Sequence, residues 1–144
     1  MKLIIENWRS YVNEESGVVS CGILAYREND GQIEFLLGTP PNANYWTVFK
    51  GIKEDEEGEK EAAEREFEEE ALNGVRGAFK GEYVSEQPFL GTVGAGKRKK
   101  QLKIWLVKMD MDVSTFVPNT SPEHTIDAPG QWFDGEPEIV DIKW

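Results

Sequence analysis

The chain has 144 residues, of which 39% are hydrophobic and 30% are charged, and its formal net charge is −11. This size and composition are typical of one globular domain with its own core. The negative charge argues against a protein that binds bulk nucleic acid, because such proteins need a basic surface.

The cysteine content and the lengths of the apolar runs indicate the compartment. Cys21 is the only cysteine, so no internal disulfide can form and a reducing compartment is expected. No apolar run is long enough to cross a membrane, and the N-terminus lacks the long apolar segment of a signal peptide. We therefore expect a soluble cytoplasmic protein that does not bind membranes.

The N-terminal segment, residues 1–15, is expected to be an added element in front of a main domain at residues 16–144. Within residues 2–13 the apolar side chains recur at helical spacing, which favours a short amphipathic helix packed on the domain. A helix that docks on a partner protein is the alternative. The apolar positions are Ile4, Trp8, Tyr11 and Val12, with Leu3 and Ile5 beside them.

Several stretches of the main domain have the pattern of β-strands. The apolar, β-branched run at 17–26 and the run at 32–37 predict two strands, antiparallel through the turn-forming residues 27–31. Further strands are expected at 46–49 and 102–109, with short final elements near 132–133 and 139–140.

The most acidic part of the chain is residues 51–72, with eleven acids between Glu54 and Glu70. A helix is expected from about residue 59 to residue 72, with Ala63, Phe67 and Ala71 on its apolar stripe and Asn73–Gly74 at its end. Glu66, Glu69 and Glu70 share one helix face because they stand at i, i+3 and i+4. Carboxylates that close repel one another, and a hard divalent cation between them would offset that repulsion. A solvated acidic helix is the alternative.

The spacing of Gly51, Glu57 and residues 65–70 resembles the signature of the Nudix hydrolase family. That signature is Gly, five residues, Glu, seven residues, Arg-Glu, a bulky apolar residue, any residue, Glu-Glu, any residue and Gly. One position departs, since Leu72 stands where the family has its closing glycine. The resemblance implies an α/β/α sandwich with a mixed β-sheet, here with a reduced or missing C-terminal helix.

The resemblance also implies roles for individual residues. Glu57 would pair with Arg65 and fix the loop against the helix, and Glu69 or Glu70 would take a proton from the attacking water. The expected ion is Mg²⁺ or Mn²⁺, which suits hard oxygen ligands. Its ligands would be Glu66, Glu69 and Glu70, a backbone carbonyl at Gly51 or Lys50, and Glu123 as a further candidate.

Less extensive similarities concern the substrate. Residues 46–51 resemble the Trp-x-x-Pro-Lys-Gly segment of the diadenosine polyphosphate and diphosphoinositol branch of the family, with Phe49 in place of proline. The basic loop at 97–100 and the segment 121–124 also resemble that branch. The candidates for phosphate contact are Lys50, Lys97, Lys99 and Lys103, and those for stacking on a base are Tyr45 and Trp105.

The reaction implied is hydrolysis of a phosphoanhydride bond in a nucleoside diphosphate linked to another group, by an enzyme that acts as a monomer or homodimer on a small phosphate-rich nucleotide. A dinucleoside polyphosphate is the leading candidate. The competing substrates are a nucleoside triphosphate, ADP-ribose or another sugar nucleotide, and capped RNA. A nucleotide-binding regulatory module is the alternative that is not an enzyme.

Overall fold

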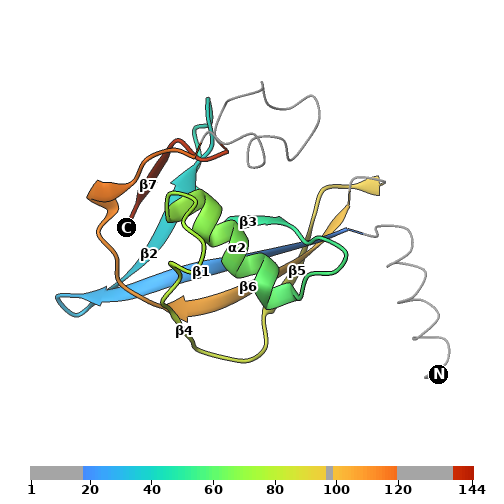
Figure 1. The fold of residues 1–144 in the computed structure, drawn as a ribbon, viewed down its shortest axis with the longest axis horizontal. Coiled ribbons are helices and arrows are strands. Elements are labelled where there is room, and N and C mark those ends of the chain that lie inside the picture. Colours follow the sequence, from blue (N-terminus) through green and yellow to red (C-terminus); the bar gives the residue numbers. More distant parts are fainter. Residues whose placement is uncertain (1–17, 97–98, 120–137) are drawn as a thin grey trace.

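The computed structural model describes residues 18–96, 99–119 and 138–144, and the predicted N-terminal helix lies outside them. The described elements, shown in Figure 1, are β1 (Val19–Asn29), β2 (Gln32–Thr39), β3 (Phe49–Ile52), α2 (Glu59–Ala71), β4 (Glu82–Tyr83), β5 (Phe89–Val93), β6 (Lys100–Lys108), η2 (Val113–Thr115) and β7 (Asp141–Lys143).

The strands form one mixed sheet of seven strands around β1. The order is β4-β6-β1-β2-β7, with β3 also paired to β1 and β5 also paired to β6. β1 runs parallel to β6 and antiparallel to β2 and β3. Its sequence is apolar over most of its length because it has a strand on both sides and α2 across one face. The mixed α/β architecture predicted from the sequence is therefore confirmed.

The predicted β1–β2 hairpin is confirmed, and its turn is short. Asp30 and Gly31 have φ values of 51° and 79°, the backbone of a two-residue hairpin turn with positive φ at both positions. The third strand lies three residues later than expected, at 49–52 instead of 46–49. Thr47 exchanges two backbone hydrogen bonds with Gly38, at 2.7 and 2.9 Å, and this bridge closes the loop before β3 begins.

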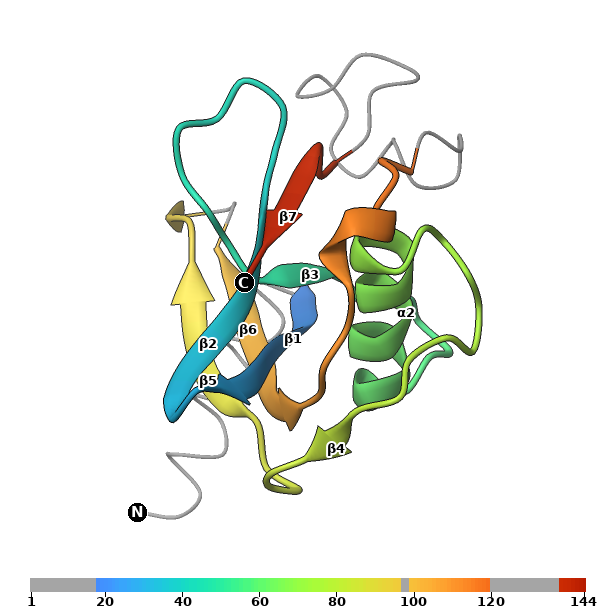
Figure 2. The same cartoon turned by 90° about the vertical axis from the view of Figure 1, so that its left-hand side faces the viewer.

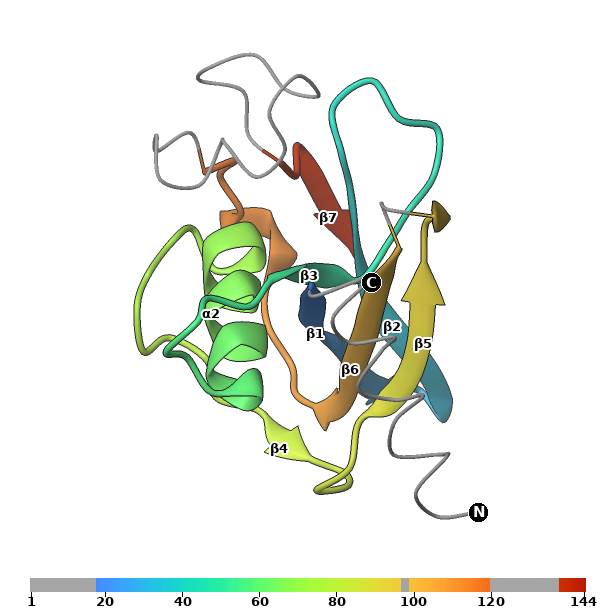
Figure 3. The ribbon, with the colours of Figure 1, turned by 90° about the vertical axis from the view of Figure 1, so that its right-hand side faces the viewer.

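The core lies between the sheet and α2, which covers one face of it (Figures 2 and 3). Ala63, Phe67 and Ala71 are buried, as the helical pattern predicts. The Phe67 ring packs edge-on against Phe49 of β3, with ring centroids 5.3 Å apart, and this contact fixes β3 beneath the helix. Among the described residues, no helix has the length and apolar character needed to cross a bilayer.

Candidate metal centre and active site

α2 carries the candidate acids, and both of its ends are defined by local contacts. At the start, the Gly58 amide donates to the Glu61 carboxylate at 3.4 Å. At the end, Leu72 keeps a negative φ of −112°, while Asn73 has a φ of 58°. The left-handed residue that ends the helix is thus Asn73, so Leu72 can replace glycine without strain.

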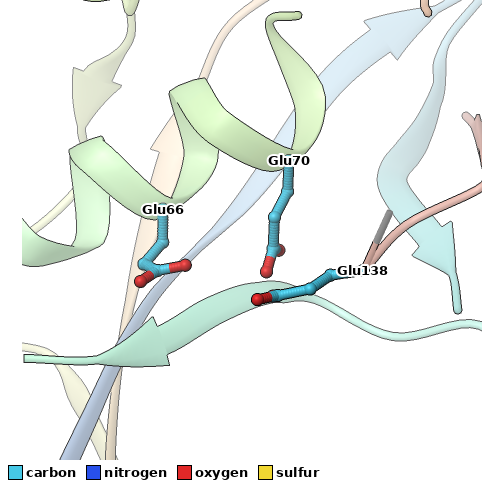
Figure 4. A group of neighbouring side chains, drawn as sticks. All are labelled: Glu66, Glu70 and Glu138. Atoms are coloured by element: carbon cyan, nitrogen blue, oxygen red, sulfur yellow. The ribbon is translucent and has the colours of Figure 1, made fainter. Parts of the chain in front are cut away.

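Three carboxylates converge beside the C-terminal half of α2. Glu66 and Glu70 come from the helix, and Glu138 comes from the segment before β7 (Figure 4). Each offers one oxygen, and the three oxygens lie within 4.8 Å of one another. Glu66 and Glu70 are buried and Glu138 is half-buried. These oxygens are the donors that a hard divalent cation prefers.

The electrostatics of this cluster favour a cation. Burial and the charges of Glu66 and Glu138 raise the pKa of Glu70 well above its ordinary value, and a hydrogen bond with Glu138 acts in the same direction. The charge of Lys50 opposes this shift. Without a metal ion, these surroundings therefore favour the protonated form of Glu70. A divalent cation would instead stabilise all three carboxylates in their charged form.

β3 supplies the floor beneath Glu66. Gly51 pairs with Cys21 of β1, and its α-carbon faces the helix. A Cβ on Gly51 would overlap the Glu66 carboxylate. The absence of a side chain at residue 51 therefore makes the space in which Glu66 lies.

Arg65 fixes the loop before α2 against the helix. Its Nε donates to Glu57 Oε2 at 2.6 Å and its Nη2 donates to Glu57 Oε1 at 3.1 Å. Nη2 also donates to the Ile52 carbonyl at 3.1 Å. Nη1 lies 2.9 Å from Glu66 Oε1 and 3.2 Å from Glu69 Oε2. We call this group of contacts the Arg65 brace.

The brace is buried, and this affects the ionisation of its members. Burial opposes the charge on Arg65, but the hydrogen bonds that Arg65 donates to Glu57 and the charges of Glu66 and Glu69 raise its pKa above the ordinary value. Burial also opposes the charge on Glu57 and so raises its pKa. The hydrogen bonds that Glu57 accepts from Arg65 and from the Glu54 backbone amide lower this pKa by more, so the net shift is downward. Both groups are therefore charged at neutral pH.

The structure brings together only some of the residues singled out from the sequence. Glu69 contacts Arg65 rather than joining the oxygens of the three-carboxylate cluster. Lys103 forms an ion pair with Glu59 at 2.6 Å. Glu59 lies on α2 about two turns, or roughly 10 Å, before Glu66. Trp105 is a core residue whose indole nitrogen donates to the Glu86 carbonyl at 3.4 Å, so it cannot stack on a base.

The remaining predicted contacts have more varied positions. Tyr45 is exposed on the loop between β2 and β3, and Lys99 is exposed next to β6. Lys50 is half-buried on β3, close enough for its charge to act on Glu70. Lys97 and Glu123 lie outside the described residues.

Sequence reasoning missed Glu138. It lies between Pro137 and Ile139, and no helical or strand spacing connects it to Glu66 or Glu70. The pairing of β7 with β2, from Leu37–Lys143 to Thr39–Asp141, brings it to α2. No local sequence pattern predicts the pairing of two strands that lie so far apart in the chain.

No family model and no curated protein matches the chain, but solved structures do. One crystal structure of C. elegans Ap4A hydrolase is 32% identical, covers 63% of this chain and 67% of its own, and has a TM-score of 0.54. A binary complex of C. elegans Ap4A hydrolase is 26% identical, covers 88% of this chain and 78% of its own, and has a TM-score of 0.59.

A more distant structure shares the fold alone. The NUDIX domain of Shewanella oneidensis NrtR, complexed with ADP ribose, is 14% identical over 88% of this chain and 71% of its own, with a TM-score of 0.52. The fold, the motif from Gly51 to Glu70 and the 32% identity to a hydrolase agree. The chain belongs to the Nudix hydrolase family, the enzymes that cleave phosphoanhydride bonds.

Proposed function

We propose that this protein is a metal-dependent pyrophosphohydrolase of dinucleoside polyphosphates, with Mg²⁺ or Mn²⁺ held by Glu66, Glu70 and Glu138. The cluster of three carboxylates, of which Glu66 and Glu70 are buried, carries the proposal. Burial removes these groups from water, and like charges in a low-dielectric site are costly without a cation. The backbone of Lys50 or Gly51 is a further candidate ligand.

The ion, when bound, would neutralise phosphate charge and lower the pKa of water. The chain's own residues have three tasks. The Arg65 brace holds Glu66 in place over Gly51 and orients Glu69 beside the cluster. Glu69 is less buried than Glu66 and Glu70, and it accepts the proton of the attacking water. The positive charge of Lys50 on β3 acts on Glu70, and we propose that it also attracts the phosphate chain.

The substrate class rests on separate observations. The two C. elegans structures are of an Ap4A hydrolase. Tyr45 is exposed on the β2–β3 loop, and the next residue, Trp46, lies under Lys143 with the ammonium 4.0 Å from its ring centroid. This loop offers an aromatic surface for a base and a nearby cation for phosphate. We propose that it binds one nucleoside and that Lys99 contacts the distal phosphates.

Turnover of diadenosine tetraphosphate with added Mg²⁺ tests the function. We expect Glu70→Gln to lower kcat/KM about a hundredfold or more, because a lost ligand removes several kcal/mol of charge stabilisation. Glu56→Gln removes the same charge from an exposed loop residue and should leave the rate unchanged. Full activity in Glu70→Gln would show that the metal site is misassigned.

A substrate panel tests the class of nucleotide independently of the site. We expect kcat/KM to be highest for dinucleoside polyphosphates, ahead of nucleoside triphosphates, ADP-ribose and capped RNA. Activity on triphosphates without activity on dinucleoside polyphosphates would reject the substrate proposal and leave the metal site intact. Tight binding of a nucleotide without any turnover would indicate a regulatory module.

A further inference from the structure

The sheet has a second face, opposite α2, which we call the outer face. Side chains alternate between the two faces along each strand, and Cys21, Ile23 and Trp105 belong to the core under α2. The residues between them therefore point to the outer face. Its apolar members are Leu24 and Tyr26 on β1, Ile33, Phe35 and Leu37 on β2, Phe89 and Val93 on β5, and Leu102, Ile104 and Leu106 on β6.

These side chains are neighbours across the strands as well as along them. Residues paired directly on one face contact each other, so the apolar surface is continuous from β2 to β5. The strand register pairs Tyr26 with Phe35, Leu24 with Leu106, and Ile104 with Phe89.

In the part of the chain that the structure describes, the outer face is exposed on β2 and β5 and half-buried on the central strands β1 and β6. Ile33 is 59% exposed, Phe35 44% and Phe89 65%. Figures 2 and 3 show α2 on one side of the sheet and, among the described residues, no helix on the other. A continuous apolar surface over four strands of a globular protein marks a contact surface.

We propose that residues 2–13 form an amphipathic helix that packs on the outer face. The pattern of this segment fits such a surface: Ile4, Trp8 and Val12 recur every four residues, and Glu6 and Ser10 lie on the opposite side of the helix. A stripe of that kind is stabilised by packing on an apolar partner, since an isolated helix of twelve residues is marginal in water.

The dimensions and the connection also fit. Twelve helical residues span about 18 Å, and the outer face of β1 from Ser20 to Tyr26 spans about 20 Å. Residues 14–18 join the segment directly to β1 and reach up to about 17 Å when extended. A layer packed on a sheet lies about 10 Å from it. The linker is therefore long enough for the segment to fold back over its own strand.

Protection of a cysteine on the outer face tests this proposal. Phe35→Cys in the full chain places a thiol on the face, to be labelled by a water-soluble maleimide. The native Cys21 is fully buried, and burial raises its pKa to about 11, so it does not compete. Thr92→Cys is the reference, because Thr92 is exposed on the other side of β5.

Two substitutions in residues 2–13 test the apolar side and the polar side of the proposed helix separately. We expect Trp8→Asp to speed the labelling of Phe35→Cys at least tenfold. Ser10→Asp adds the same charge on the opposite side of the helix, and we expect it to leave the labelling rate unchanged. Neither should alter the labelling of Thr92→Cys. If Trp8→Asp does not fold, the chain without residues 1–14 replaces it, and a synthetic peptide of residues 1–15 should restore protection.

Three results would overturn the proposal. Labelling of Phe35→Cys as fast as that of Thr92→Cys in the otherwise intact chain would show an open face. Protection that Trp8→Asp leaves intact but that falls on dilution would assign the face to a second copy of the chain. Protection that depends on added nucleotide alone would assign it to substrate. None of these results bears on the proposed metal site.

Discussion

Arg65 contacts both carboxylate oxygens of Glu57, at 2.6 and 3.1 Å, and the pair is largely buried. The same guanidinium reaches β3 through the Ile52 carbonyl and α2 through Glu66 and Glu69. A planar group with several donors can join three segments in this way, whereas an ammonium cannot reproduce the geometry. The brace thus links the loop, the strand and the helix that surround the acids.

Loss of the brace should reduce stability. We expect Glu57→Gln to lower the free energy of unfolding by about 1.5–3 kcal/mol, because it removes charged hydrogen bonds from a site where Glu57 is only 12% exposed. Urea unfolding without added metal measures this. The control is Glu86→Gln, which breaks the Lys60–Glu86 pair where Glu86 is 85% exposed; it should leave stability unchanged. Equal losses in both variants would contradict a special role for the brace.

The brace also predicts a pH dependence. The pKa of Glu57 is lower in the folded chain than its unfolded value of about 4.3. Its ionised form therefore stabilises the fold fully above that value, and the contribution is lost as the pH falls through the lower folded pKa. Melting temperatures between pH 2 and pH 6 should fall less steeply in acid for Glu57→Gln than for the native chain. Identical slopes would argue against this ionisation.

Gly51 should tolerate no side chain. We expect Gly51→Ala to weaken Mn²⁺ binding at least tenfold and to lower activity, because the added methyl group occupies the space of the Glu66 carboxylate. Isothermal titration gives the affinity. Gly91→Ala is the matched control, since a Cβ there meets only Leu102 Cβ at 3.9 Å. Retention of native affinity in Gly51→Ala would mean that Glu66 can move without consequence for the metal.

Glu138 should be a stronger ligand than Glu123. Glu138 has an oxygen in the carboxylate cluster, so Glu138→Gln should weaken Mn²⁺ binding at least tenfold. Glu123→Gln, which changes the same charge fifteen residues earlier, should leave the affinity unchanged. The reverse result would replace Glu138 with Glu123, which the sequence analysis gave as a further candidate ligand beside Glu66, Glu69 and Glu70.

Asn73 should matter for both its backbone and its side chain. Its Nδ2 donates to the Thr115 carbonyl at 3.0 Å, and its Oδ1 accepts from the Val117 amide at 2.8 Å. Asn73→Gly keeps the left-handed backbone and should lose about 1–2 kcal/mol of stability with the two hydrogen bonds. Asn73→Ala should lose about 1 kcal/mol more, because alanine is strained at a φ of 58°. Equal thermal stability of the two variants would rule out the backbone effect.

The parts of the fold and site that follow from local patterns could be predicted, and those made by distant contacts could not. The spacing of Glu66 and Glu70 predicts a shared helix face without knowledge of the sheet. The strand patterns predict β1, β2 and β6 for the same reason. Glu138 reaches the cluster only through the pairing of β7 with β2. Lys103 stays a candidate phosphate contact, and its pairing with Glu59 could not be predicted because no local spacing joins a strand residue to the start of α2.

The origin of Glu138 has a kinetic consequence. Glu66 and Glu70 are in place once α2 has formed and packed, but Glu138 arrives only when β7 pairs with β2, an event that closes more than a hundred residues of chain. An ion held by all three carboxylates binds only the state in which β7 is attached. Divalent metal should therefore slow the detachment of β7 and the unfolding that follows, and leave the rate at which α2 and the central strands assemble almost unchanged.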